Sequence, residues 1–339
     1  MAITIKDIAR MSNVSTATVS RVINSPEKVS RAKKAVIEQI MNELDYQPNA
    51  LARGLIKRTT KTIGIFIPDI NNMFYPAVVR GTEDIFEKND YNVFLCNTDN
   101  NIEKEKKYIN ALLEKRVDGI IFMGTRPVDG KKNEHIKALS NKLPVLTVND
   151  TITGANVYSV LTDEAGGAYT AVSYLIGLGH RRIAHITGES DLYTTYRNKQ
   201  KGYEAALRDN GIKADSRLVI SGQPYPEGGY GGALKLFELE EVPTAVFAAS
   251  DQIAVGVMKA AFERGIKIPE DISVVGYANI PISADLYPGL TTVDQFPYET
   301  GRLAAEEFTK ILSGGKPARK KIMLKPRLEI RKSCKRLEA

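Results

Sequence analysis

The stretch VSTATVSRVIN, residues 14–24, places spaced apolar residues among short hydroxyl side chains and one arginine. Val19, Val22 and Ile23 recur at helical spacing, which predicts a short helix with one buried face. The side chains that then face outward are Thr16, Ala17, Ser20 and Arg21. Short side chains allow a helix to approach base edges closely, and an arginine can donate two hydrogen bonds to guanine. The alternative is an ordinary amphipathic surface helix.

The segments on either side of this stretch have the same periodicity. Apolar residues share one helical face in an earlier segment, at Ile5, Ile8 and Ala9, and in a later one, at Ile37, Ile40, Met41 and Leu44. We therefore predict three short helices around one small core. Between the first two, Asn13 suits a left-handed turn, Val14 can fill the core and Ser15 can cap the next helix. Ser30 is placed to cap the third helix.

Longer stretches resemble a known family. TIKDIARMSNVSTATVSRVIN at residues 4–24, followed by YQPNALARGL at 46–55, is similar to the DNA-binding head and hinge of the lactose repressor (LacI/GalR) family. Ordered matches continue through the chain, from IGIFIPDINNMFYPAVVRG at 63–81 to LTTVDQF at 290–296. The resemblance implies that Thr16, Ala17 and Arg21 read bases in the major groove. Further DNA contacts are expected from Thr4, Ser15, Thr18, Ser20 and Asn24.

The segment after the head has a physical interpretation of its own. Pro48 can open a helix that continues for about two turns to Leu55. So short a helix is marginal in water and should form when it docks. The resemblance implies that paired hinge helices of a dimer enter the minor groove, where Leu55 wedges between base pairs, alongside Asn49, Ala52 and Arg53. Arg53 is well placed for a phosphate. The alternative for Leu55 is a plain core leucine.

The rest of the chain alternates β-branched runs with amphipathic segments, in two similar series. This order predicts an α/β body of two doubly wound parallel sheets with helices on both faces. The resemblance implies a periplasmic-binding-protein-like body whose chain crosses three times between its halves. The expected domains are a helix-turn-helix head at 1–46, a hinge and linker at 47–60, and an effector-binding and dimerisation domain at 61–339. Its expected N-subdomain is 61–162 with 292–323, and its C-subdomain is 163–291 with 324–339.

Ligands of such sheets bind beyond the carboxyl ends of the strands, so a cleft between the halves is the expected site. Polar residues follow predicted strands at Asp69, Asp150, Asp251 and Asn279. The other candidates are Phe74, Tyr75, Thr195, Arg197, Lys199 and Tyr225. Carboxylates, an amide and cations suit a polyhydroxylated ligand, because each buried hydroxyl needs a donor and an acceptor. The alternative for each polar residue is a cap of the next helix or turn.

One position departs from the family pattern. Many sugar-responsive members have an acidic residue directly after the GY or GF of the strand ISVVGY, and Ala278 stands there in this chain. A ligand contact is therefore missing or replaced. Because Arg197 and Lys199 are nearby in the expected cleft, an acidic or otherwise unusual sugar is one hypothesis for the effector.

The charge is unevenly distributed. The net charge is +7 over 339 residues, but residues 1–60 carry +5, residues 61–315 carry −6 and residues 316–339 carry +8. A basic head on an acidic body is expected of a chain that meets a polyanion; for the tail, a solvated face is the favoured interpretation. The start of the chain has no secretory signal, and no apolar run is long enough to span a bilayer, so we expect a bacterial cytoplasmic, nucleoid-associated protein without a membrane partner.

Other functional classes fit poorly. Two cysteines and three histidines are too scattered for a metal site, and no Walker A sequence, strand-linked GxGxxG or catalytic dyad occurs, so we expect no cofactor and no enzyme. GGYGG at 228–232 lacks the lysine of a phosphate loop and is expected to be a loop entering a helix. A secreted solute-binding protein would have no use for the head.

The sequence therefore predicts a homodimeric transcriptional regulator. Two heads related by a two-fold axis would read a pseudo-palindromic operator, and a sugar or sugar acid between the body halves would control affinity. The lactose repressor's extra tetramerisation helix is not expected. The alternative is a catabolite-control-like regulator whose corepressor is a phosphorylated carrier protein. Against it, Glu306 and Glu307 stand where a basic contact residue would be needed, and carboxylates repel a phosphoserine.

Overall fold

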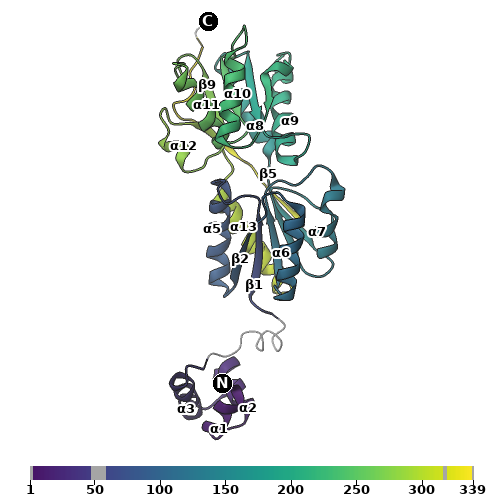
Figure 1. The fold of residues 1–339 in the computed structure, drawn as a ribbon, viewed down its shortest axis with the longest axis vertical. Coiled ribbons are helices and arrows are strands. Elements are labelled where there is room, and N and C mark those ends of the chain that lie inside the picture. The colour runs from purple at the N-terminus through teal and green to yellow at the C-terminus, as the bar shows by residue number, and fades with distance from the viewer. Residues whose placement is uncertain (1–2, 47–58, 316–318, 338–339) are drawn as a thin grey trace. The chain divides into compact units, whose positions relative to one another are not determined.

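The structure is a computed structural model that describes residues 3–46, 59–315 and 319–337. The chain divides into two compact units, and the boundary between them in the sequence falls between Lys61 and Thr62 (Figure 1). The smaller unit is called the head and the larger unit the body. The predicted hinge helix lies outside the described residues.

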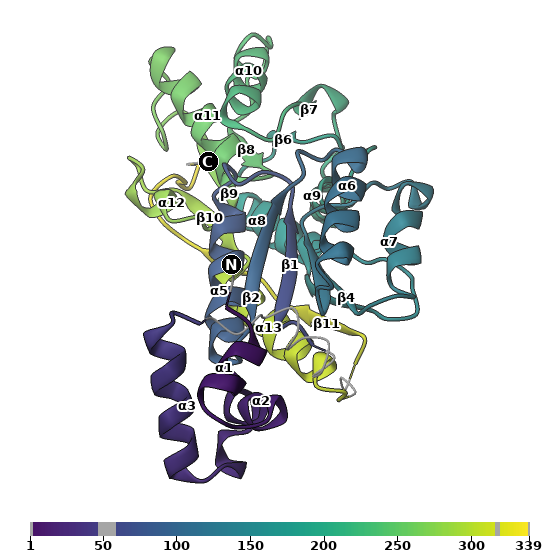
Figure 2. The same ribbon diagram turned by 60° about the horizontal axis from the view of Figure 1, so that its bottom comes forward.

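The head contains the predicted three helices. They are α1 (Ile5–Met11), α2 (Thr16–Asn24) and α3 (Arg31–Glu43), with a 3-10 turn, η1 (Pro26–Lys28), before the third. Ile8, Val19 and Ile37 are fully buried and hold one residue from each helix in a common core, as the periodicity predicted. Figure 2 shows the three helices grouped together.

The turns of the head are set by short polar residues. The amide of Thr4 donates to Asp7 at 3.0 Å, which starts α1, and Asn13 is left-handed with a φ of 51°. The Ser15 hydroxyl accepts a hydrogen bond from the Thr18 amide at 3.1 Å, so the predicted cap of α2 is confirmed. Ser30 occupies the N-cap of α3, but its side chain makes no capping bond. The predicted N-cap position of Ser30 is therefore confirmed, although the capping hydrogen bond is not formed.

The first half of the body, called the N-lobe, is a six-stranded parallel sheet with the order β11-β5-β4-β3-β1-β2. Its strands are β1 (Thr62–Ile67), β2 (Asn92–Asn97), β3 (Gly119–Met123), β4 (Val145–Val148), β5 (Val157–Thr162) and β11 (Lys321–Leu324). One face packs against α5 (Phe74–Lys88) and α13 (Pro297–Leu312), and the other against α6 (Ile102–Glu114) and α7 (Glu134–Leu139), which follows η2 (Gly130–Asn133). Successive strand residues alternate between these faces, as in Ile65 and Phe66.

The second half, called the C-lobe, is a sheet with the order β12-β10-β9-β8-β6-β7, in which only β12 runs antiparallel. Its strands are β6 (Ile183–Thr187), β7 (Val219–Ser221), β8 (Ala245–Ala248), β9 (Ser273–Ala278), β10 (Thr291–Asp294) and β12 (Arg327–Glu329). Its helices are α8 (Glu164–Gly177), α9 (Thr194–Asp209), α10 (Pro226–Phe237), α11 (Asp251–Glu263) and α12 (Ile282–Asp285), with η3 (Ser216–Leu218). Helices α8 and α9 cover one face, and α10 and α11 cover the other.

The chain crosses between the lobes three times: after β5, after β10, and between β11 and β12. Two of the predicted boundaries need correction. Thr292, Val293 and Asp294 pair with β9 of the C-lobe, although the prediction placed residue 292 onward in the N-lobe. Leu324 pairs with Thr162 of the N-lobe rather than belonging to the C-lobe. Both boundaries shift for the same reason. A strand stays in one lobe until its last backbone-paired residue, so the chain crosses to the other lobe only after the strand ends.

The GGYGG stretch is part of α10, so the prediction of a loop is wrong. A Cβ at Gly229 would lie 2.0 Å from the carbonyl oxygen of Ile253, and one at Gly256 would lie 1.9 Å from that of Pro226. These glycines therefore allow α10 and α11 to approach backbone to backbone, which is a packing requirement and not a turn. Within the described chain, no helix combines the length and apolarity needed to cross a membrane.

Candidate functional site

The first candidate surface is the outward side of α2. Thr16, Ala17 and Arg21 are exposed, and Ser20 is half-buried. No hydrogen bond or ion pair to the other described residues engages the Thr16 hydroxyl or the Arg21 guanidinium. Because α2 starts at Thr16, these groups lie on its first two turns, where a recognition helix meets base edges.

The other predicted DNA contacts of the head have local partners. The Ser15 and Thr18 hydroxyls are 2.9 Å apart, and the Asn24 amide donates to the Ser20 carbonyl oxygen at 2.9 Å. The Thr4 hydroxyl donates to Asp7 at 2.7 Å. Their roles toward DNA remain predictions. Those of Asn49, Ala52, Arg53 and Leu55 also remain predictions, because these residues lie outside the described part of the chain.

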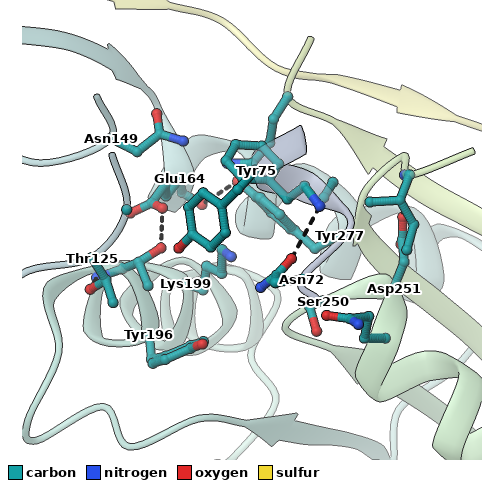
Figure 3. A pocket seen from close by; sticks show the side chains of 17 residues that line it. Asn72, Tyr75, Thr125, Asn149, Glu164, Tyr196, Lys199, Ser250, Asp251 and Tyr277 are labelled. Atoms are coloured by element: carbon teal, nitrogen blue, oxygen red, sulfur yellow. Dashed lines mark hydrogen bonds between the residues drawn. The ribbon is translucent and has the colours of Figure 1, made fainter. Parts of the chain in front are cut away.

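The second candidate site is a cavity between the two lobes of the body (Figure 3). Five of the predicted residues line it: Phe74, Tyr75, Thr195, Lys199 and Asp251. Sequence reasoning missed other lining groups, among them Asn72, Asn149, Glu164, Tyr196 and Tyr277. They come from the loops after β1 and β4, the start of α8, the helix α9 and the strand β9. The carboxyl ends of strands from both sheets therefore meet here, as the topology predicted.

A buried lysine and a buried glutamate give the cavity its chemistry. Lys199 is on α9, donates to the carbonyl oxygen of Ala249 at 3.0 Å, and holds its ammonium 4.2 Å from the ring centre of Tyr277. Glu164 accepts hydrogen bonds from Thr195 and from Asn198. Figure 3 shows the lysine and the glutamate directed toward the same space.

These two charges do not neutralise each other by direct contact. Burial is the main cause of both pKa shifts: it raises the pKa of Glu164 and lowers the pKa of Lys199, while their mutual attraction opposes both changes. Lysine has three donors, and the carbonyl of Ala249 occupies one. The cavity therefore presents unused donors beside a carboxylate acceptor, and the Tyr75 and Tyr196 rings add aromatic surface.

Several predicted ligand contacts instead join the two lobes. The Tyr225 hydroxyl of the C-lobe donates to Asp69 of the N-lobe at 2.7 Å. The Thr194 hydroxyl of the C-lobe donates to Asp150 of the N-lobe at 2.5 Å. Neither Asp69, Asp150 nor Tyr225 lines the cavity. We call these contacts, together with the segment contacts described next, the clasp.

Two extended segments form the other part of the clasp. The Val128 amide donates to the Leu192 carbonyl oxygen at 2.9 Å, and the Thr194 amide donates to the Arg126 carbonyl oxygen at 3.2 Å. Arg126 is buried, and its guanidinium makes a bidentate pair with Glu105 at 2.7 and 2.8 Å. Its amide also donates to Asp150 at 2.6 Å. The N-lobe therefore holds its side of the clasp rigidly, and the lobes are closed on each other.

The remaining predicted residues have partners inside the C-lobe. The Arg197 guanidinium donates to the carbonyl oxygens of Ser190 and Asp191 at 3.3 and 3.2 Å, and so supports the loop before α9. Asn279 donates to Asp294 at 3.0 Å and accepts from Arg331 at 2.7 Å. Neither Arg197 nor Asn279 lines the cavity.

Asp251 lines the cavity, but its carboxylate is occupied. It accepts hydrogen bonds from the Ile280 amide at 2.9 Å, the Ser283 hydroxyl at 2.7 Å and the Thr292 hydroxyl at 2.5 Å. This is close to the capping role that was its alternative interpretation. A role of Asp251 in ligand binding stays a prediction.

Comparison with known proteins identifies the two units. Residues 4–49 match the model of bacterial regulatory proteins of the lacI family, and residues 172–334 match that of the periplasmic binding protein-like domain. Catabolite control protein A of Priestia megaterium is 36% identical over 99% of this chain and 100% of its own.

Two solved structures extend the comparison. The lac repressor dimer bound to operator and the anti-inducer ONPF has a TM-score of 0.87 at 26% identity and covers 99% of this chain and 100% of that one. A LacI family regulator from Enterococcus faecium with bound ribose has a TM-score of 0.73 at 30% identity, over 82% of this chain and 100% of that one. The fold and its two surfaces define a two-lobed ligand receptor joined to a helix-turn-helix head. The chain belongs to the lacI family of bacterial regulatory proteins, and it is a DNA-binding transcriptional regulator rather than an enzyme.

The exposed guanidinium of Arg21 leads to a first prediction. Arg21→Ala should weaken binding to a duplex selected from a random pool by about 1 to 3 kcal/mol, because one base pair per half-site loses its bidentate donor. Binding to an unselected duplex of equal length should change little. Fluorescence anisotropy with both duplexes measures the difference, and an equal loss on both would contradict base reading. Lys33→Ala, an exposed change on α3, is the matched control.

The clasp leads to a second prediction. Thr194→Val leaves the buried Asp150 carboxylate short of a donor, which should cost the body about 1 to 3 kcal/mol in urea unfolding. It should also favour separation of the lobes, seen as a larger radius of gyration in X-ray scattering. Thr170→Val, which removes an exposed hydroxyl on α8, is the control and should change neither quantity. A variant with unaltered stability and radius would show that the clasp does not hold the lobes.

Proposed function

We propose that this protein is a homodimeric repressor of carbohydrate-utilisation genes, with operator affinity set by a sugar or sugar derivative held between its lobes. The observation that carries the proposal is the pair of buried, oppositely charged groups, Glu164 and Lys199, that line the interlobe cavity without a direct ion pair. An ammonium with free donors and a carboxylate acceptor, beside tyrosine rings, match the alternating donors and acceptors of a polyhydroxylated molecule.

Within this class, a neutral sugar is favoured over a sugar acid. Arg197, which suggested an anionic ligand, is bound to backbone carbonyl groups outside the cavity. Glu164 adds a carboxylate to the cavity itself and would repel a second one at close range. The ribose held by the Enterococcus relative is in keeping with this choice.

The position of the cavity supports a mechanism. A ligand that contacts both lobes changes the balance between closed and separated lobes, and the N-lobe carries the chain to the head at Thr62. By resemblance to the family, the placement of two N-lobes in a dimer sets the pairing of the hinge helices and of Leu55 at the operator centre. Linkage requires only that the ligand bind the two arrangements differently, and it fixes neither induction nor corepression.

A phosphorylated carrier protein is the second candidate effector, favoured by the 36% identity to catabolite control protein A. The surface of α13 argues against it. Arg302 contacts Glu299 at 2.6 Å and Glu306 at 2.5 Å, and Lys310 contacts Glu307 at 2.5 Å. The cations of this helix are therefore neutralised by neighbouring carboxylates, which leaves little charge to attract a phosphoserine.

The proposed dimer draws support from an apolar hollow on the C-lobe. Phe262 at the end of α11 is 84% exposed and Tyr287 after α12 is 98% exposed. Both line one surface hollow together with Met258, Ile266 and Pro288. Large apolar side chains gathered at one exposed place are typical of a surface that another protein covers, and a second copy of this chain is the occupant that a two-fold operator requires.

A ligand screen tests the proposed effector. Neutral sugars should raise the melting temperature, since a ligand at 100 times its dissociation constant stabilises by about 2.7 kcal/mol. Lys199→Met should weaken the binding of such a sugar at least about tenfold, because the cavity loses its ammonium donor. Lys201→Met, an exposed lysine on the same helix, should bind normally. If only a serine-phosphorylated carrier protein strengthens DNA binding and no sugar binds, the second candidate effector replaces the first.

A charge placed in the apolar hollow tests the dimer. Phe262→Glu should raise the dimer dissociation constant at least about tenfold in sedimentation velocity, because a carboxylate would be buried against apolar groups. Ile330→Glu, at another exposed apolar residue, is the matched control and should leave the dimer intact. Circular dichroism confirms that each variant is folded. Unchanged association of Phe262→Glu would place the interface elsewhere.

A further inference from the structure

One edge of the N-lobe sheet gathers positive charge. All six strands of this sheet are parallel, so the loops that precede them lie at a common edge, the amino edge. Figure 1 shows the start of β1 and the ends of α5, α6 and α13 at the same end of the lobe. Exposed cations in these loops and at the adjoining ends of helices and strands include Lys88, Lys115, Lys142, Arg319, Lys320 and Lys321.

These cations lack the neutralisation found elsewhere in the lobe. Among the described residues, none of the six forms an ion pair with a carboxylate. Away from this edge, in contrast, Lys104 pairs with Asp99 at 2.6 Å and Lys106 pairs with Glu103 at 2.8 Å. Exposed carboxylates at the edge, at Glu87, Asp90 and Glu114, are fewer than the cations. The edge therefore keeps positive charge although residues 61–315 as a whole carry −6.

The opposite edge of the same sheet carries both carboxylates and cations. Asp69, Asp99 and Asp150 follow β1, β2 and β4 there, on the side of the cleft. Carboxylates thus follow three of the strands where they end, beside cations such as Lys104, whereas exposed cations gather where the strands begin. One contact helps to hold the basic side together, because the Lys320 ammonium donates to the carbonyl oxygen of Ala155 at 3.0 Å, in the loop before β5.

The connection to the head limits the distance between this edge and DNA that the head binds. Residue 62 starts β1 at the amino edge, and the head ends its described part at Tyr46. Tyr46 and residue 62 can lie at most about 58 Å apart even when the residues between them are fully extended. A duplex bound to the head therefore stays within reach of the amino edge. The carboxyl edge lies at the other ends of the strands, one strand length farther from residue 62.

We propose that the amino edge of the N-lobe is a second, sequence-independent contact surface for double-stranded DNA. Its lysines and arginines bind backbone phosphates beside the site read by α2, and each contact releases condensed counterions. The surface adds affinity without adding sequence information. The proposal also gives a function to Arg319, Lys320 and Lys321 of the basic C-terminal segment. Their interpretation as a merely solvated face assigns them none.

The salt dependence of DNA binding tests this proposal. Arg319→Ser combined with Lys321→Ser removes two of the exposed charges at the amino edge, whereas Lys131→Ser combined with Lys132→Ser removes two exposed charges from η2, after the carboxyl end of β3. Affinity for a mixed-sequence 40-base-pair duplex is measured by fluorescence anisotropy from 50 to 200 mM KCl. The slope of log K against log salt should lose about 1.8 to 3.6 in magnitude for the first pair, because the proposed dimer loses one or two phosphate contacts from each protomer at roughly 0.9 per contact.

The loss of affinity of the first pair relative to the wild type should accordingly shrink by about 12- to 150-fold between the two salt concentrations, while the η2 pair should match the wild type. A wild-type slope in the first pair, or equal changes in both pairs, would overturn the proposal, since the second result reflects only net charge. The probe has no selected sequence and no effector is added. The result therefore does not depend on whether the proposed effector binds or on whether Arg21 reads a base.

Discussion

The direction of the strands is the constraint on which the body depends. In a parallel sheet every strand begins at one edge and ends at the other, and each βα loop therefore opens on the same side. Two such sheets joined by three crossings turn their carboxyl edges toward each other. This arrangement brings together groups from four distant parts of the chain, such as Tyr75, Glu164, Lys199 and Tyr277, and it leaves the amino edge of the N-lobe for a different use.

The small core of the head determines the orientation of α2. Its core consists mainly of one or two apolar side chains from each helix, with Ile8, Val19 and Ile37 fully buried. So small a core fixes which face of α2 is left for solvent, since a rotation of the helix would expose Val19 and bury Arg21. The residues that fold the head and those that would meet DNA are therefore different members of the same nine-residue helix.

Local patterns were sufficient for the fold but not for all of the site. Helical spacing located the three head helices, and alternation of strand and helix predicted both sheets, because those periods are set by each element's own geometry. The site depends on hydrogen bonds between the lobes, and such contacts produce no periodic pattern in the sequence. Tyr225 meets Asp69 over 156 positions of sequence, and Thr194 meets Asp150 over 44. Acidic residues at strand ends were rightly expected at the cleft, but the sequence could not distinguish those that join the lobes from those that line the cavity.

Glu164 illustrates the same limit from the other side. It follows β5 just as Asp69 follows β1, so position alone would have made it a candidate. Its importance comes from Lys199, one helix later, whose burial could be known only from the packing of α9 against Tyr277. The prediction of a loop at the glycines of α10 failed for a different reason. Glycine is favoured both where two helices approach closely and where the chain turns, so the residue type alone does not distinguish the two.

The clasp and the cavity act on lobe closure in opposite directions. Each clasp hydrogen bond contributes a net of about 0.5 to 1.5 kcal/mol to closure, and more where an ionised carboxylate accepts it. The cavity also holds Glu164 and Lys199 without a direct ion pair, and burial disfavours the charged form of each. The clasp favours the closed arrangement, whereas burial of the two charges opposes it to the extent that closure shields them from water. A ligand that satisfies both charges removes the unfavourable contribution and keeps the clasp, and a differential affinity of about 5.5 kcal/mol is enough to move such an equilibrium from 1:99 to 99:1. The same buried charges that cost stability in the unliganded protein therefore make the cleft responsive to what fills it.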